Sequence, residues 1–330
     1  MNPLRLFRHV FSGQTNRGYC PVCQKNTFFV ETGSWLRDQY LCLWCRSIPR
    51  QRALMTVLDS LFPDFRTLKI HESSPCGSAS DKLARECPGY LPSQYFPCAS
   101  LGSVKDGFRN ENLEKMTFPD NSFDLTITQD VMEHVLNPDR AFAEIARTLK
   151  PSGLHLFTLP LYNRPETKIR ARESENGIEC LEEMEFHGNP VDAAGSLVTR
   201  EWGLDVTDFI SRHSGMSSNI YRTVDRKLGI DGEFLEVFVS RKNMPDTYDQ
   251  SSSLLPPAIS CDPGKRQLVG ISPSGPTSAR PRPGSQGIIC RTSSASWATK
   301  TCAIRWRANH SPSWSTKVRG GMIWQFRYGN

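Results

Sequence analysis

Four of the eleven cysteines stand in a pattern that can hold a metal ion. Cys20 and Cys23 form one Cys-x-x-Cys knuckle, Cys42 and Cys45 form a second, and 18 residues separate the two. A knuckle turns two sulfurs toward one ion, and two knuckles complete the tetrahedron that zinc prefers. The alternatives are four free thiols or a redox pair, although a redox pair needs only one such motif. The spacing predicts a zinc ribbon with a Zn²⁺ site that is closed by four thiolates.

A second set of reactive side chains follows a strand-like segment. Phe123–Gln129 has the pattern of a buried strand, and Asp130, Glu133 and His134 come directly after it. Ligands of open α/β sheets bind where the strands end at their carboxyl side. An imidazole with an ordinary pKa of about 6.5 suits proton transfer, so Glu133 and His134 are catalytic candidates. The alternative for His134 is that it packs on, or caps, the helix that follows.

A long connection supplies one further candidate. Residues 161–203 show no regular pattern, and a segment of this length inside a compact domain is often functional. Over the strand ends it would form a substrate-side insertion. It contains His187, which we add to the catalytic candidates. The alternative is a turn residue that is hydrogen-bonded to the backbone.

The surrounding elements alternate between strand and helix. Leu54, Val57, Leu58 and Leu61 share one face of a predicted helix over Arg50–Leu61, which would dock the zinc ribbon on the next domain. Further helices are predicted over Asn137–Leu149 and Asp205–His213, and strands over Leu68–Glu72, Ser93–Phe96, Phe123–Gln129, Leu154–Leu159, Ser218–Val224 and Glu233–Ser240. The last two strands should form a hairpin that turns at Gly229–Gly232. This order predicts a doubly wound, mostly parallel α/β sheet.

Four segments of this region, in this order, resemble the class I S-adenosylmethionine-dependent methyltransferases of the type 11 group. They are Glu72–Gly77 at the first loop, Asn112–Pro119, Phe123–Val135, and the Leu149–Gly153 turn. The resemblance implies a Rossmann-like seven-stranded sheet and S-adenosylmethionine as cofactor. It places the cofactor contacts at Glu72, Ser73, Gly77, Asn112, Leu113, Gln129 and Asp130.

The sequence departs from that family at two points. The first loop of the family has three glycines, of which only Gly77 stands here, and no acid follows the strand at Ser93–Phe96. Glu72 would contact the amino group of the cofactor or order the loop. We expect methyl transfer to an unidentified acceptor, such as a small molecule or a sugar oxygen. The alternatives are an rRNA or tRNA methyltransferase that recognises nucleic acid through the zinc ribbon, and an inactive scaffold with the same fold.

Charge and composition divide the chain further. The chain has 40 Lys and Arg residues and 34 Asp and Glu residues. Residues 251–330 contain eleven of the basic residues and one of the acidic ones, so residues 1–250 hold 29 basic and 33 acidic residues. The net charge of +6 therefore belongs to the tail, and the folded part is not a basic nucleic-acid binder by charge. We expect three parts: residues 1–63 with the ribbon, 64–242 with the methyltransferase domain, and 243–330 as a disordered basic tail that the fold does not need. With no signal peptide and no membrane span in the sequence, we expect a cytoplasmic protein.

Overall fold

The structure is a computed structural model that describes residues 15–189, 191–243 and 269–271. The chain divides into two compact units, Met1–Arg291 and Thr292–Asn330, and all described residues belong to the first. No helix in the described ranges is both long enough and apolar enough to cross a bilayer.

The N-terminal part is a small antiparallel sheet around the two cysteine knuckles. It contains β1 (Thr15–Cys20), β2 (Lys25–Glu31), the short helix α2 (Leu36–Gln39) and β3 (Tyr40–Cys42), in the strand order β1-β2-β3. The first knuckle turns the chain from β1 into β2. We call residues 15–61, which include the following helix α3, the cysteine module.

Helix α3 (Pro49–Leu61) confirms the predicted docking helix. Pro49 occupies the first helical turn, where its missing N–H costs no hydrogen bond. Leu54, Val57 and Leu58 are fully buried. They belong to a hydrophobic cluster that contains Cys20 and Phe29 of the cysteine module as well as Leu125 and Leu156 of the large sheet. The module is therefore packed on the sheet through a shared core.

The large sheet has nine strands in the order β18-β16-β17-β9-β8-β4-β5-β7-β6. The strands are β4 (Ile70–Ser73), β5 (Tyr90–Gln94), β6 (Val104–Lys105), β7 (Phe108–Asn110), β8 (Phe123–Gln129), β9 (Leu149–Thr158), β16 (Ser217–Arg222), β17 (Val237–Arg241) and β18 (Val269–Ile271). Five central strands, β7, β5, β4, β8 and β9, pair in parallel, whereas β17 and β16 pair antiparallel at one side. The chain order reverses between β4 and β8, which is where doubly wound folds bind ligands.

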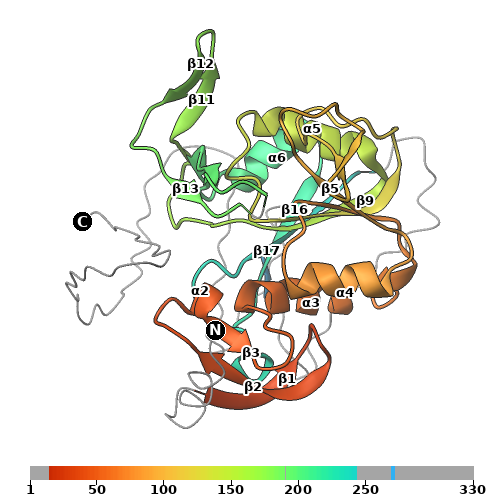
Figure 1. Cartoon of the computed structure of the whole chain (residues 1–330), viewed down its shortest axis with the longest axis vertical. Coiled ribbons are helices and arrows are strands. Elements are labelled where there is room, and N and C mark those ends of the chain that lie inside the picture. The colour runs from red at the N-terminus through yellow and green to blue at the C-terminus, as the bar shows by residue number, and fades with distance from the viewer. Residues whose placement is uncertain (1–14, 190, 244–268, 272–330) are drawn as a thin grey trace, which may run out of the picture. The chain divides into compact units, whose positions relative to one another are not determined.

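Helices cover both faces of this sheet (Figure 1). The 3-10 turn η1 (Phe65–Thr67) leads from α3 into β4; α3 and α4 (Ser78–Glu86) lie on one face, and α5 (Pro138–Thr148) and α6 (Val206–Ser214) on the other. Strand β8 contributes to both cores. Leu125 and Ile127 share one face and join the cluster with α3 and α4, whereas Phe123, on the other side of a register shift between Phe123 and Leu125, joins the cluster with α5 and α6. The predicted mixed, mostly parallel α/β architecture is confirmed.

Two short edge strands enlarge the predicted seven-stranded sheet to nine. Asp106 and Gly107, with φ of 51° and 82°, make a two-residue turn between β6 and β7. At the opposite edge, β18 pairs antiparallel with β16. This segment belongs to the tail that we expected to lack structure, so the expectation is wrong for Val269–Ile271. The rest of the predicted tail beyond residue 243 lies outside the described residues.

The connection between β16 and β17 is longer than predicted. The two strands pair as expected, but residues 223–236 between them include the 3-10 turn η2 (Arg226–Leu228) and do not form a tight hairpin. Gly229 ends η2 with a φ of 67°, and a Cβ there would lie 2.4 Å from the Phe29 ring. A glycine is needed at residue 229 because the connection packs directly against β2 of the cysteine module there.

The segment 161–203 is not without regular structure. It forms three two-stranded ribbons: β10 (Lys168–Ile169) with β15 (Arg200–Glu201), β11 (Ala171–Ser174) with β12 (Gly177–Cys180), and β13 (Phe186–His187) with β14 (Ser196–Leu197). The β11–β12 ribbon projects away from the sheet (Figure 1). Ribbons of two to four residues give too short an alternation to stand out in the sequence.

Candidate functional site

The four predicted cysteine ligands converge. Their sulfur atoms all lie within 4.8 Å of one another, with 3.7 Å between Cys20 and Cys45 and 3.8 Å between Cys23 and Cys42. Zn–S bonds of about 2.3 Å in a tetrahedron separate two sulfurs by about 3.8 Å. The residues therefore fit a zinc ion, and zinc at this position would be held by thiolates alone.

Sequence reasoning missed the polar groups that surround these sulfurs. The Ser47 hydroxyl lies 3.3 Å from the Cys20 sulfur and 3.2 Å from the Cys45 sulfur. Arg52 is completely buried and donates hydrogen bonds to the carbonyl oxygens of Ser47, Tyr40 and Gly229. Burial lowers the pKa of Arg52 to about 10, and the neighbouring cysteines act in the opposite direction. Its positive charge offsets part of the negative charge that four thiolates and one Zn²⁺ carry.

Glu72, the next-to-last residue of β4, lies in a hydrogen-bond network. The side chain is fully buried and accepts hydrogen bonds from the Tyr90 hydroxyl at 2.6 Å, from the Ser80 hydroxyl at 2.9 Å and from the Gln129 amide at 2.7 Å. Burial raises the pKa of Glu72, and these donors counter the shift. Because Ser80 belongs to α4, Glu72 fixes the start of this helix. Of the two roles expected for Glu72, the contacts favour ordering of the loop.

Gly77 lies where the first loop packs against the cysteine module. Its φ is 79°, and a Cβ would lie 2.2 Å from the amide nitrogen of Gln51. That amide donates to the Cys76 carbonyl at 3.0 Å, and the Ser78 hydroxyl donates to the carbonyl of Cys45. The space that a side chain at residue 77 would need is thus filled by Gln51 of α3, whereas we expected the cofactor to lie there.

Asp130 is held by two arginines of the cysteine module. Its carboxylate lies 2.6 Å from Arg37 and 3.2 Å from Arg50, and it accepts a hydrogen bond from the Thr158 hydroxyl at 2.8 Å. Burial alone would raise the pKa of Asp130, but the two guanidinium groups hold it well below its usual range. Asp130 is therefore ionised at neutral pH, and its charge is already paired.

The three predicted catalytic residues lie together, although His187 is more than 50 residues from the other two. The rings of His134 and His187 meet edge to face with centroids 5.0 Å apart, and the His134 Nε2 lies 3.9 Å from Glu133 Oε1. Burial raises the pKa of Glu133 to about 8, and Asp130 adds to the shift. Burial also lowers the pKa of His134 to about 4. His134 is therefore neutral at pH 7.

The remaining predicted cofactor residues are divided. Ser73 is buried beside Glu72 at the end of β4, and Gln129 bonds Glu72 at the end of β8. Asn112 uses its side-chain oxygen to accept from the Glu114 backbone, and Leu113 is buried in the cluster with α5 and α6. Leu113 is thus a core residue in this structure, and its predicted adenine contact gains no support from these contacts.

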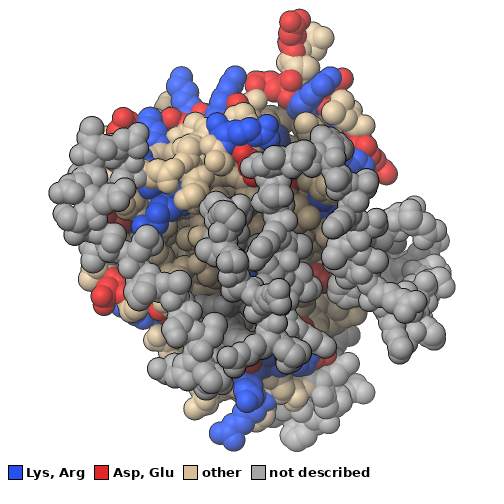
Figure 2. All heavy atoms as spheres, turned by 180° about the vertical axis from the view of Figure 1, so that it is seen from behind, with Lys and Arg blue, Asp and Glu red and all other residues tan. Residues whose placement is uncertain are grey.

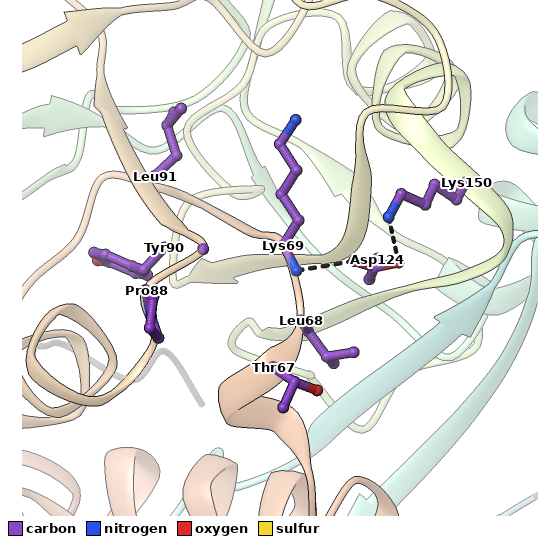
Figure 3. Close-up of a pocket in the computed structure, with 9 residues that line it drawn as sticks. Thr67, Leu68, Lys69, Pro88, Tyr90, Leu91, Asp124 and Lys150 are labelled. Carbon is purple, nitrogen blue, oxygen red and sulfur yellow. Dashed lines mark hydrogen bonds and ion pairs between the residues drawn. The ribbon is translucent and has the colours of Figure 1, made fainter.

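A pocket of about 500 Å³ lies at the opposite, amino edge of the sheet (Figure 3). It is lined by residues that precede or begin β4, β5 and β8, together with Lys150. The carboxylate of Asp124 accepts hydrogen bonds there from the Lys150 ammonium at 2.7 Å and the Lys69 backbone at 2.8 Å. A second pocket of about 220 Å³ lies between the knuckle cysteines Cys23 and Cys45 and helix α4. Neither pocket is lined by Glu72, Gly77 or Asp130.

Parts of the chain are similar to known methyltransferases. Residues 94–157, from the end of β5 to β9, match the family described as "Methyltransferase domain". Over 155 residues the chain is 25% identical to an uncharacterized methyltransferase of Schizosaccharomyces pombe, an alignment that covers 44% of this chain and 53% of that protein. A shorter match of 42 residues is 48% identical to the ubiquinone/menaquinone biosynthesis C-methyltransferase of Hydrogenovibrio crunogenus and covers 13% and 16% of the two chains.

Solved structures include an S-adenosylmethionine dependent methyltransferase from Mesorhizobium loti, with a TM-score of 0.36 and 16% identity over 57% of this chain and 97% of that one. The chain spans about half the length of the first curated relative and a smaller part of the second. Residues 94–157 are thus similar to methyltransferase domains, and a four-cysteine cluster precedes this segment in the chain.

Proposed function

We propose that the protein transfers a methyl group from S-adenosylmethionine to an acceptor that binds between the carboxyl edge of the sheet and the segment 161–203. The match of residues 94–157 to methyltransferase domains carries this proposal. The strand order supports it, because doubly wound folds bind ligands at the carboxyl ends of the strands where the chain order reverses, which here are β4 and β8.

In methyl transfer the protein itself forms no covalent bond with the substrate. The sulfonium methyl is already activated, so the enzyme must orient the nucleophile in line with the breaking S–C bond and accept its proton. Glu133, His134 and His187 are the groups that we propose for the acceptor side. On the cofactor side we propose Gly77 and Asp130, with Gln51, Arg37 and Arg50 of the cysteine module as additional walls, because these side chains contact Gly77 and Asp130.

The charges of the described residues favour a small-molecule or sugar oxygen acceptor over RNA. Arg50 pairs with Asp130, and Arg52 is buried, so only Arg46 of the three arginines near the second knuckle is exposed. On the face seen in Figure 2, basic and acidic side chains are interspersed where described residues are visible. Recognition of a phosphate backbone would need a denser basic surface than these side chains provide.

One observation favours a second function, a binding scaffold with the methyltransferase fold. Arg37, Arg50 and Gln51 already contact Asp130 and Gly77, the positions where a cofactor would approach the loops. If these side chains stay in place, they exclude the methionine part of the cofactor.

Methyl-labelled S-adenosylmethionine separates these functions. Purified full-length protein is incubated with the labelled cofactor and with either the small-molecule extract or the RNA of the source cells. Label in a small-molecule product supports the proposal, and label in RNA supports the ribbon-guided alternative. Absence of label from both pools, together with no cofactor binding, would leave the scaffold.

A further inference from the structure

We propose that Glu133, His134 and His187 form a second metal site, for a divalent first-row transition metal ion, beside the proposed acceptor crevice. One ligand atom of each residue lies within 4.8 Å of the others. Binding of the ion does not depend on the proposed methyl transfer, whereas its role toward an acceptor rests on that function.

The fold holds the three residues from two directions. Glu133 and His134 lie in the loop that follows β8, and His187 lies in β13 of the segment 161–203. The two parts are tied by backbone contacts, because the Thr199 N–H donates to the Glu133 carbonyl at 2.8 Å and the Thr199 hydroxyl to the Val135 carbonyl at 2.8 Å. The site is therefore built on anchored backbone.

The carboxylate of Glu133 is the strongest indication of a missing partner. Its side chain is 2% exposed, and neither carboxylate oxygen has a hydrogen-bond partner among the described residues. A buried carboxylate without a donor is costly, and buried charges are normally paired or bound to metals. A divalent ion between Glu133 and the two imidazoles would satisfy both oxygens.

The orientation of His134 suits a ligand. Its Nδ1 lies 2.9 Å from the Leu197 carbonyl oxygen, which can only accept, so Nδ1 carries the proton. The lone pair is then on Nε2, 3.9 Å from Glu133 Oε1. Histidine ligands of metals typically donate their other N–H to a carbonyl in this way. Donors at about 2.1 Å from a tetrahedral ion are about 3.4 Å apart, so a small side-chain rotation closes the site.

A neighbouring carboxylate supports His187 in the same manner. Glu185 Oε1 lies 3.4 Å from the His187 Nε2, and Arg170 lies 3.2 Å from the other oxygen of Glu185. Two imidazoles and one carboxylate select borderline ions such as Zn²⁺, Mn²⁺, Fe²⁺ or Co²⁺, and they leave coordination positions open. The four-cysteine site differs in both respects, because it is closed and its ligands are soft.

Through its open coordination positions the ion could bind the hydroxyl oxygen of the acceptor. A hydroxyl oxygen that binds the ion loses its proton to solvent more easily. The oxygen then forms the new O–CH₃ bond, the S–CH₃ bond of S-adenosylmethionine breaks, and its electron pair stays on sulfur to give S-adenosylhomocysteine.

Metal analysis tests the site without any assay of methyl transfer. Full-length protein is dialysed separately against ZnCl₂, MnCl₂ and CoCl₂, and the total metal bound per chain is measured after removal of free ions. We expect two equivalents in at least one of these dialyses, one in the cysteine cluster and one in the second site. His134→Ala and His187→Ala should each lose one equivalent, and the matched control His213→Ala, at an exposed histidine of α6, should lose none.

Two results would overturn the proposal. One is a single equivalent in the wild-type protein with all three metals. The other is a second equivalent that persists in both His134→Ala and His187→Ala. Circular dichroism of each variant shows whether it is folded. His187 is the more accessible of the two imidazoles, with 25% of its side chain exposed against 15% for His134, so His187→Ala is the safer variant for folding. If the metal binds but no methyl transfer occurs, the site stands and the proposed function fails.

Discussion

At the scale of single residues, Asp130 links the two parts of the fold through charge. Its φ is 53°, and its partners Arg37 and Arg50 belong to the cysteine module. The sequence placed Asp130 correctly at the end of a strand, but the arginines that pair with it were beyond prediction. They precede it by about 80 to 90 residues, and only the docking of α3 brings them to the carboxyl edge.

Asp130→Asn should therefore destabilise the fold, in addition to any effect on cofactor binding. The substitution leaves the Arg37 guanidinium, which is 7% exposed, without its main counter-charge. Loss of one partner of a buried pair costs about 3 kcal/mol. Urea unfolding measures this loss. The control Asp120→Asn removes an exposed partner of Arg147 and should cost about 1 kcal/mol or less. Equal losses in both variants would contradict the assignment.

Gly77→Val tests whether the first loop contacts the cofactor. A second glycine with positive φ is Gly107, where an added Cβ would have no atom within 4 Å, so Gly107→Val is the matched control for backbone strain. Both substitutions should cost at least about 1–2 kcal/mol of stability, because both put a side chain at a positive φ. Gly77→Val should cost more, because its ψ of −170° lies in a region open almost only to glycine and its side chain must displace Gln51. Only Gly77→Val should weaken S-adenosylmethionine binding, by tenfold or more, since its branched side chain would stand at the loop where we propose that the cofactor binds. Equal affinities in the two variants would place the cofactor elsewhere.

At the scale of elements, the cysteine module is the part that the sequence predicted most completely. The knuckle spacing and the helix pattern in α3 are local signals, so neither depends on the rest of the chain. Strand β7 and the β13–β14 ribbon escaped prediction, because segments of two or three residues form only when neighbouring strands offer hydrogen bonds. Tertiary pairing, and not the alternation of side chains, defines them.

The convergence of Glu133 and His134 with His187 was predictable only in part. The sequence indicated that each belongs to the ends of strands or to the segment 161–203. Their contact depends on the β13–β14 ribbon and on the Leu197 carbonyl that orients His134. No periodic pattern encodes such a backbone contact.

Cys42→Ser should remove the zinc and destabilise the module. Thiolate ligands supply the binding energy of a structural zinc, and that energy contributes to folding. We expect loss of about one equivalent of zinc by elemental analysis and of more than about 3 kcal/mol of unfolding free energy. Cys98→Ser, at an exposed cysteine outside the cluster, is the control and should change neither value. Full zinc content in Cys42→Ser would contradict the four-thiolate site.

At the scale of the whole molecule, the cysteine module and the sheet act as one folding unit. One hydrophobic cluster runs from Cys20 through α3 to Leu156 and Val237, and η2 packs its Gly229 against Phe29. A change in the zinc site should therefore reach the cofactor loop, because Cys45 and Gln51 contact that loop directly. The module is part of the proposed site and not a separate appendage.

Removal of the C-terminal region shows whether this folding unit needs the residues beyond 250. Of residues 244–330, the structure describes only β18, which pairs three residues with the edge strand β16. A chain that ends at residue 250 should retain its zinc and lose at most about 2 kcal/mol, the net contribution of a few edge hydrogen bonds. Thermal unfolding and zinc analysis of this truncated chain measure both. Loss of cooperative unfolding would show that the fold needs the region beyond residue 250.

Calorimetric titration of the zinc-loaded protein with S-adenosylmethionine measures whether the cofactor binds. We expect saturable binding to one site per chain, competition by S-adenosylhomocysteine, and weaker binding to Gly77→Val than to Gly107→Val. The absence of any heat of binding at millimolar cofactor, in protein that carries its zinc and unfolds cooperatively, would contradict this expectation. Such a result would mean that Arg37, Arg50 and Gln51 keep the cofactor out of a fold that no longer transfers methyl groups.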